Sequence, residues 1–432
     1  MMKRFFALLK VFDIRKISKT ATFRQALITF FGTITNGALS AVFYILAARI
    51  LGPANFGLLT IAIATLTLIA DIGGLGTDTG LVRFVGKYVK KSKDKVSRFL
   101  KLGLEVKVAV WLLVLITGWA LAPLISKTIF AKPQLILPLR ISFIGVGSYL
   151  LYSFILHALQ GFQKFWTWSG FQIGSSGIRV LVVLILFIYS KLNLETTLAV
   201  FVSVPLLAFL VGLFLLPINF FKVKKETSVA KEFFKYNKWV AAFTAVAAVG
   251  ARLDTFISAR LLTAADVGVY GAAHKMAAII PQLVGALGTV IAPKMAGMGK
   301  IKDLVSYFKK TQLLVLGISL LGILSIPLVL FFIPILLGSE YAASGELFVV
   351  LLFAMLIFLI SVPVHMAVIY YFSYPKLFLW ISLGHLVIIA GGGWVLISSF
   401  GAMGAAFTVL IGHIFNFVVP AVWVLSKIRK ST

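Results

Sequence analysis

The chain has 432 residues, of which 60% are hydrophobic and only 12% are charged, and its formal net charge is +28. Because a soluble domain carries about 25% charged residues, this composition excludes a water-soluble fold and predicts an integral membrane protein. The sequence contains no cysteine, which excludes disulfides, thiolate metal sites and cysteine nucleophiles.

The basic segment 1–23 places Phe5, Leu9 and Phe12 at helical spacing. It predicts an amphipathic helix on the cytoplasmic membrane surface and not a cleavable signal. Twelve apolar stretches follow, each long enough to cross a bilayer. They lie at roughly 25–50, 55–80, 100–122, 135–160, 168–190, 196–221, 239–262, 267–292, 312–336, 346–372, 377–399 and 402–425.

These spans predict an all-α fold with six transmembrane helices in each half. The N-lobe would occupy 24–221 and the C-lobe 239–426. Between them lies the basic segment 222–238, which we interpret as a cytoplasmic linker, and 427–432 would form a short cytoplasmic tail. An even number of spans gives both lobes the same orientation. A pseudo-two-fold axis along the membrane normal should therefore relate them.

The positive charge is distributed as a membrane topology requires, not as a nucleic-acid site. The loop 83–101 holds eight Lys or Arg residues, whereas the opposite loops, such as 52–54 and 400–401, carry none. This is the positive-inside pattern, and it places both termini on the cytoplasmic side of the cell membrane. It argues against nucleic acid as a partner.

A short repeat supports the division into halves. The sequence Ala48–Gly57 is echoed by Ala259–Gly268, with five of ten positions identical, at an offset of 211 residues. The same offset pairs Thr33 with Thr244 and Pro123 with Pro334. Chains built from two similar membrane halves commonly move a solute through the interface between them. The repeat therefore favours transport.

Four cations lie inside the expected spans: Arg140, Arg179, Arg252 and Lys275. An ionisable group in the bilayer costs at least about 2.5–3.5 kcal/mol, so it usually faces protein or a hydrated cavity. Only two carboxylates, Asp71 and Asp254, lie at comparable depth. The surplus predicts a cationic cavity that binds an anionic solute; pairing or snorkelling to an interface is the alternative.

The acidic residues Asp71, Asp78 and Asp254 are candidates for binding a coupling proton or sodium ion. Each is equally compatible with a structural ion pair to an arginine. The five histidines offer proton relays or simply hydrogen-bonded packing. The sequence contains no phosphate-binding loop of the form G-x-x-x-x-G-K-[ST], and no metal or cofactor is expected.

A resemblance to a known family rests on three segments: 51–57 with Arg49 ahead of it, then Asp71-Ile72-Gly73, then Val82-Arg83-Phe84. Within them Arg49, Gly52, Pro53, Gly57, Gly73 and Arg83 form a signature similar to that of the polysaccharide-biosynthesis flippases. These are the Wzx-like O-antigen and repeat-unit transporters of the exporter superfamily that also contains the MATE exporters and the lipid II flippase. The segment that begins at Pro293-Lys294-Met295 resembles the equivalent part of the second half.

The resemblance implies a V-shaped MATE-like bundle and turnover of a polyprenyl- or dolichyl-phosphate-linked oligosaccharide by alternating access. The expected partners are this lipid-linked anionic oligosaccharide, membrane lipids and glycan-assembly enzymes. Two alternatives stay open. A cation-coupled multidrug exporter of the same fold should carry net acid in its cavity. An integral membrane glycan polymerase or ligase should carry a larger outer loop with acid or base residues. The expected protein is a transporter and not an enzyme.

Overall fold

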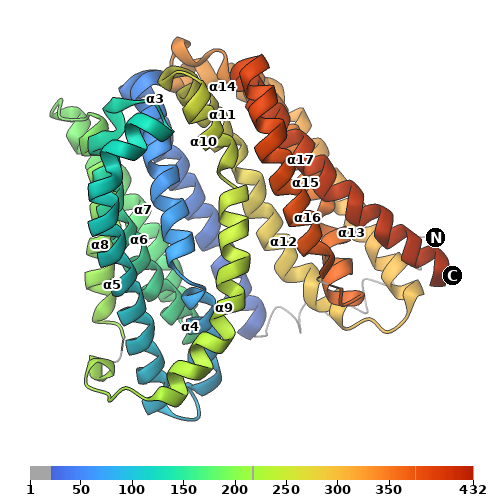
Figure 1. Ribbon diagram of the computed structural model, residues 1–432. Helices are drawn as coiled ribbons and strands as arrows, with labels where there is room; N and C mark the ends of the chain where they lie inside the picture. The colour runs from blue at the N-terminus through green and yellow to red at the C-terminus, as the bar shows by residue number, and fades with distance from the viewer. Residues whose placement is uncertain (1–20, 217, 375, 432) are drawn as a thin grey trace.

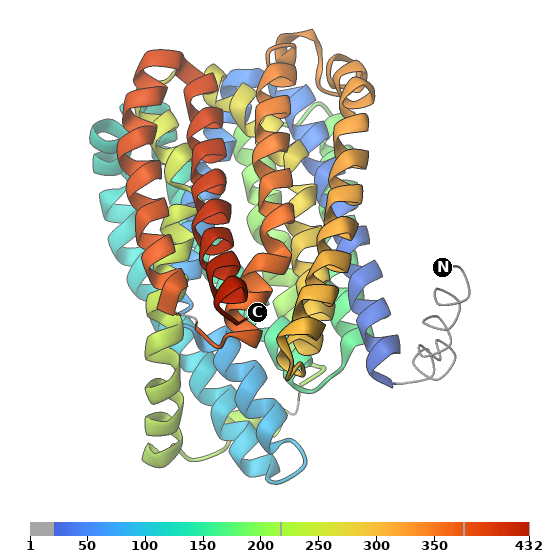
Figure 2. The same cartoon turned by 90° about the vertical axis from the view of Figure 1, so that its right-hand side faces the viewer.

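A computed structural model describes residues 21–216, 218–374 and 376–431, and within these ranges the regular structure is entirely helical. The expected surface helix in segment 1–23 falls almost wholly outside the described residues. The helices form two groups that converge at one end of the molecule and diverge toward the other (Figure 1). We name the convergent end, where the chain bends at Gly52 and again at Gly401, the Gly52 end. The opposite end, where the loop before the helix that begins at Lys93 lies (Figure 2), is the Lys93 end.

The first group, the N-lobe, and the second group, the C-lobe, follow each other along the chain. The N-lobe contains α3 (Ala21–Gly73), α4 (Thr77–Tyr88), α5 (Lys93–Leu124), α6 (Ile136–Gly161), α7 (Phe165–Ile188) and α8 (Leu194–Leu213). The C-lobe contains α9 (Thr227–Gly250), α10 (Leu253–Leu261), α11 (Ala264–Ala277), α12 (Ile279–Ala296), α13 (Ile301–Leu324), α14 (Ile326–Leu337), α15 (Ser344–Met366), α16 (Lys376–Val387) and α17 (Gly393–Ser431).

Two of these helices are each two spans joined at a glycine. Gly52 has φ 70° within α3, and Gly401 has φ 59° within α17. A residue with a side chain rarely adopts such a backbone conformation, so glycine permits the chain to reverse there without a longer loop. Pro53 follows the first kink and is tolerated because it begins the second half of α3.

The number of spans is consistent with the expected twelve. Within the described ranges, nine helical stretches are long and apolar enough to cross a membrane, and the stretches that contain Gly52 and Gly401 each supply two crossings. The ninth expected span corresponds to α13 with the short apolar helix α14. The eighth corresponds to α11 and α12 in succession. The protein is therefore a multi-pass membrane protein, and its helices are consistent with six spans in each lobe.

The repeat detected in the sequence forms the contact between the lobes at the Gly52 end. A Cβ atom added to Gly57 would lie 1.8 Å from the carbonyl oxygen of Ala264, and one added to Gly268 would lie 1.9 Å from that of Pro53. Gly57 and Gly268 are equivalent in the repeat, as are Pro53 and Ala264. The two copies therefore pack against each other reciprocally, as a pseudo-two-fold axis requires.

Two further contacts repeat this symmetry. The Tyr341 hydroxyl donates a hydrogen bond to the Ala48 carbonyl at 2.9 Å. The Lys132 ammonium donates to the Ala259 carbonyl at 2.5 Å and to that of Leu262 at 2.7 Å. Ala48 and Ala259 are equivalent in the repeat. Burial lowers the pKa of Lys132, and the charge of Arg260 lowers it further. Its bonds to two carbonyls offset part of that desolvation.

The segment 222–238 differs from the expected linker, because α9 already begins at Thr227. Its first turns pack against the N-lobe at the Lys93 end, where α4 and α9 lie side by side (Figure 1). Arg98 of α5 bonds Glu226 at 2.6 Å, and Lys87 of α4 bonds Glu232 at 2.8 Å. Two acidic residues of this basic segment therefore attach the start of α9 to the neighbouring lobe.

Candidate functional site

A cavity of about 280 Å³ lies between the lobes. From the N-lobe it is lined by α3, through Tyr44, Leu59, Thr60, Ile63, Ala64 and Thr67. From the C-lobe it is lined by the junction of α9 and α10 and by α11, through Ala251, Arg252, Thr255, Tyr270, Gly271, His274 and Lys275. Two of these residues are cations, and no carboxylate is among them. Asp71, outside this lining, pairs with Arg252, so the positive character expected of an anion site comes mainly from Lys275.

Arg252 lies at the break between α9 and α10. Its Nη2 contacts Asp71 Oδ2 at 2.6 Å, and its Nε donates to the Thr67 hydroxyl at 2.9 Å. Both partners are on α3, so the guanidinium links the two lobes. The side chains of Arg252 and Asp71 are 21% and 33% exposed, so solvent and a ligand can reach the pair.

Lys275 lies on α11, and its Nζ is 4.3 Å from the ring centroid of Tyr44. An ammonium over an aromatic face gains an electrostatic attraction of about 0.5–2 kcal/mol and keeps its charge. No ion pair of Lys275 is found in the part of the chain that the structure describes. Its charge thus remains free to attract an anion. Arg252 and Lys275, which the sequence suggested together, line the same cavity.

Arg179 and Arg140 lie elsewhere, and neither lines the interlobe cavity. The Arg179 guanidinium is 4.5 Å from the Phe201 ring centroid and 5.6 Å from that of Phe43, inside the N-lobe. The Arg140 guanidinium is 5.1 Å from the ring of Trp119. Both are accommodated by aromatic faces. Their predicted part in substrate binding has no counterpart in the geometry of this cavity.

Asp254 does not neutralise Arg252, although only one residue separates them. Its side chain is buried, and one oxygen accepts a hydrogen bond from the Tyr270 hydroxyl. It lines a second cavity, within the C-lobe, together with His274, His385 and His413. The break between α9 and α10 sends the two neighbouring side chains to different cavities.

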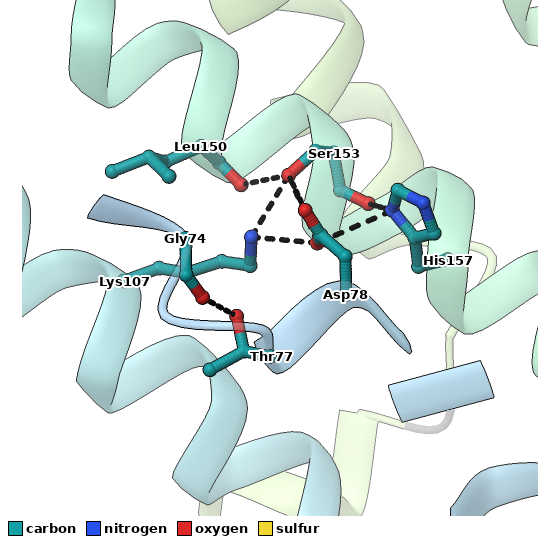
Figure 3. Close-up of polar contacts among 7 residues, drawn as sticks. All are labelled: Gly74, Thr77, Asp78, Lys107, Leu150, Ser153 and His157. Atoms are coloured by element: carbon teal, nitrogen blue, oxygen red, sulfur yellow. Dashed lines mark hydrogen bonds and ion pairs between the residues drawn. The ribbon is translucent and has the colours of Figure 1, made fainter. Parts of the chain in front are cut away.

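Asp78 belongs to a polar network within the N-lobe (Figure 3). Its Oδ1 contacts Lys107 Nζ at 2.7 Å and His157 Nδ1 at 3.2 Å, and the Ser153 hydroxyl joins the same carboxylate at 3.1 Å. Lys107 is fully buried. Breaking a buried pair by removing one partner costs about 3–5 kcal/mol. The network therefore fixes the start of α4, where Asp78 lies in the first turn.

Lys107 did not emerge from the sequence as a site residue, because it lies among apolar neighbours near the start of the third expected span. Lys107 could have been identified only by knowing that its helix packs against Asp78. One sequence does not show which helices of the N-lobe pack together. The contacts of Lys132 were not predicted for the same reason. It sits in a short loop, where a lysine usually faces water.

The signature residues of the resemblance serve structural contacts at both ends. Gly52, Pro53 and Gly57 form the kink and the lobe contact described above. The Arg49 guanidinium donates to the Ile335 carbonyl of α14. A Cβ on Gly73 would lie 2.9 Å from Val110. The Arg83 guanidinium is 4.3 Å from the ring of Tyr236, on α9. The signature residues therefore serve the packing of helices and lobes more than the binding of a ligand in the cavity.

Comparison with solved structures identifies the fold. An inward-facing multidrug resistance MATE transporter of the MOP superfamily matches with a TM-score of 0.73 and 13% identity, over 94% of this chain and 98% of that one. The lipid II flippase MurJ, in an inward closed conformation, matches with a TM-score of 0.72 and 14% identity, over 92% and 87%. An outward-facing MATE transporter matches with a TM-score of 0.60 and 14% identity, over 95% of each chain.

These likenesses establish the MATE-like fold of the MOP superfamily. A search of curated sequences found no significant match. A family model described as "Polysaccharide biosynthesis protein" matches residues 23–299, which is more than half of the chain and includes the N-lobe from residue 23 onward, the interlobe cavity and both copies of the repeat. The chain therefore belongs to the polysaccharide biosynthesis protein family.

Proposed function

We propose that this protein is a flippase that translocates a lipid-linked anionic oligosaccharide across the cytoplasmic membrane by alternating access. The observation that carries the proposal is the cavity between the lobes, which presents Arg252 and Lys275 without a carboxylate in its lining. A phosphate or diphosphate bound there would form charge-assisted hydrogen bonds with both cations. Membership of a polysaccharide biosynthesis family supplies the substrate class.

The closed contact at the Gly52 end indicates the direction of access. The basic loops lie at the Lys93 end, and the positive-inside rule assigns that end to the cytoplasm. Both chain termini would lie there as well. In this conformation the lobes are tightly joined at the opposite, external end. The cavity would thus receive its substrate from the cytoplasmic side, where lipid-linked sugars are assembled, and contacts with glycan-assembly enzymes belong to the same proposal.

The lipid tail would remain in the bilayer while the phosphate and sugars enter between the lobes. The fold offers no phosphate-binding loop for ATP, so an ion gradient or product removal would drive transport. Asp71 and Asp78 each contact a cation, whereas Asp254 has a tyrosine hydroxyl as its partner. Ion coupling through these three residues stays a prediction.

A multidrug exporter is the second candidate, because MATE transporters match the fold as well as the lipid II flippase does. The cavity distinguishes the two functions. An exporter of cationic drugs should present acid to its substrate, whereas Arg252 and Lys275 would repel a cation. The charge of the cavity lining favours the flippase.

Transport in proteoliposomes tests the proposal. The purified protein should move a polyprenyl diphosphate-linked oligosaccharide between leaflets, and Arg252→Ala and Lys275→Ala should each abolish this movement while leaving membrane insertion intact. Arg252→Lys should retain part of it, because a lysine keeps the charge but loses the fork geometry. Full transport by the Arg252→Ala, Lys275→Ala double variant would contradict the proposal. So would transport of cationic drugs by a protein that leaves the lipid-linked glycan untouched.

A further inference from the structure

A second and larger cavity lies inside the C-lobe, beside the one between the lobes. Its volume is about 490 Å³, within the range of about 300–1,000 Å³ that is typical of small-molecule sites. Ala251 and His274 line both cavities, so the two share a wall. A molecule bound at Arg252 and Lys275 therefore lies next to this second space.

The lining of the C-lobe cavity combines uncharged polar groups, one carboxylate and aromatic rings. Its polar members are Asp254, His274, Ser382, His385, His413 and Asn416. The Nδ1 atom of His413 is buried and has no hydrogen-bond partner among the described residues. Phe243 and Phe358 supply aromatic faces. Among the described residues, neither lysine nor arginine lines it, which sets this cavity apart from its neighbour.

Two interrupted helices border the cavity. α9 ends at Gly250 and α10 begins at Leu253, while α16 passes into a π-helix at Ile388–Gly392. Gly250 of the first interruption and Ile389 of the second both line the space. Interrupted membrane helices and π-helical turns recur at binding sites. The backbone as well as the side chains therefore indicates a ligand here.

We propose that the C-lobe cavity binds a sugar ring of the substrate head group, while Arg252 and Lys275 bind the phosphates that link the sugar to the lipid. This inference rests on the proposed function. Carboxylate, amide, imidazole and hydroxyl groups together supply the donors and acceptors that a ring of hydroxyls requires. The two cavities adjoin at Ala251 and His274, so a head group that extends past these residues would place its phosphates in one cavity and its sugar in the other.

Two other occupants fit the lining less well. A hydrocarbon tail would offer no hydrogen bond to the buried Nδ1 atom of His413, which has no partner among the described residues, and leaving such a polar atom in a dry site costs free energy. A coupling proton needs only one basic group. Proton binding therefore explains neither the volume of about 490 Å³ nor the aromatic faces of the lining. A sugar ring uses the volume, the polar groups and the rings together.

Binding measurements with two lipids test the inference. One probe is undecaprenyl diphosphate without sugar. The other is the lipid-linked oligosaccharide purified from cells that lack the protein, where the untransported substrate accumulates. In the unaltered protein the glycan should add affinity over the sugar-free lipid. Asn416→Ala should weaken binding of the glycan lipid about tenfold, since a buried polar contact is lost, and should leave binding of undecaprenyl diphosphate unchanged.

Steric variants give an independent measurement and a matched control. Ala247→Trp fills the cavity from α9 and should also remove the affinity gained from the glycan, whereas Ala242→Trp, on the exposed face of the same helix and outside the cavity lining, should not. Arg252→Ala should weaken binding of both lipids, because it acts on the phosphates.

The inference fails if Asn416→Ala and Ala247→Trp weaken binding of both lipids equally, or of neither. It also fails if His413→Gln alters only the pH dependence of transport and leaves glycan binding unchanged, since that result assigns the cavity to a proton. If the unaltered protein binds neither lipid, the proposed function is wrong and the inference falls with it.

Discussion

A methyl group at Gly57 should drive the lobes apart at the Gly52 end. The added Cβ would lie 1.8 Å from the Ala264 carbonyl oxygen, whereas real Cβ contacts are essentially never under 3.0 Å. The facing segments of α3 and α11 would have to separate by more than an ångström. Overpacking of this kind costs about 1–3 kcal/mol. Because the strain exists only while the lobes are joined there, Gly57→Ala should shift the population toward the conformation that opens at this end.

The shift corresponds to a change of about 5- to 150-fold in the ratio of the two conformations. It can be measured by labelling a single cysteine, since the natural chain has none. In an Ala64→Cys background, whose cysteine lines the interlobe cavity, Gly57→Ala should raise the rate of labelling by a membrane-impermeant maleimide from the external face. Gly268→Ala, its repeat equivalent, should do the same.

Gly174→Ala provides the matched control, because a Cβ there meets no atom within 4 Å. It should leave the labelling rate unchanged. If Gly57→Ala and Gly268→Ala also leave external labelling unchanged, the lobes do not part at this contact, and the assignment of the Gly52 end as the external gate is refuted.

Three further predictions concern the polar contacts. Asp71→Asn should tighten binding of undecaprenyl diphosphate, because it removes the carboxylate that competes for Arg252; calorimetry that shows weaker binding would contradict this competition. Lys107→Met should lower the free energy of unfolding by up to about 3–5 kcal/mol, since it leaves the partly exposed Asp78 carboxylate without its lysine. Asp78→Asn in the same chain should restore part of the loss in a thermal melt; an additive double variant would argue against the pair. Tyr341→Phe and Lys132→Met each remove a hydrogen-bond donor to the facing lobe, so both should raise external labelling of the Ala64→Cys chain; a change confined to one of them would show that only one side of the pseudo-symmetric contact restrains the gate.

The sequence was sufficient for the architecture because hydropathy and repeats are local properties of a chain. Apolar length located the helices, the echo of Ala48–Gly57 at Ala259–Gly268 predicted two similar halves, and the even number of spans predicted one orientation for both. The structure adds that the two echoed segments contact each other through Gly57 and Gly268. The repeat therefore reveals the pseudo-symmetry in the sequence and also forms the contact between the two lobes.

The site was less predictable, because depth in the membrane does not specify the direction of a side chain. Depth alone grouped Arg179 with Arg252 and Lys275, yet Arg179 lies against Phe43 and Phe201 while the other two line the cavity. Aromatic rings supplied by distant helices accommodate its charge. The break after α9 likewise directs the side chains of Arg252 and Asp254 into different cavities. No pattern in the sequence predicted that interruption.

The segment 222–238 shows a similar limit at the membrane surface. Its lysines indicated a cytoplasmic linker, but α9 begins within it at Thr227, and Glu226 and Glu232 contact Arg98 and Lys87 of the N-lobe. These few acids, placed among many basic residues, attach the start of α9 to the opposite lobe. Charge composition places the segment on the cytoplasmic side, which stays a prediction, whereas the pairing across the lobes is visible only in the structure.

The most direct measurement of the central claim is a structure of the protein determined with the lipid-linked oligosaccharide bound. The account predicts diphosphate density between Arg252 and Lys275 in the interlobe cavity, with Arg252 turned from Asp71 toward the phosphate. A head group bound elsewhere, with Arg252 still paired to Asp71 and the cavity occupied by lipid or solvent alone, would contradict it.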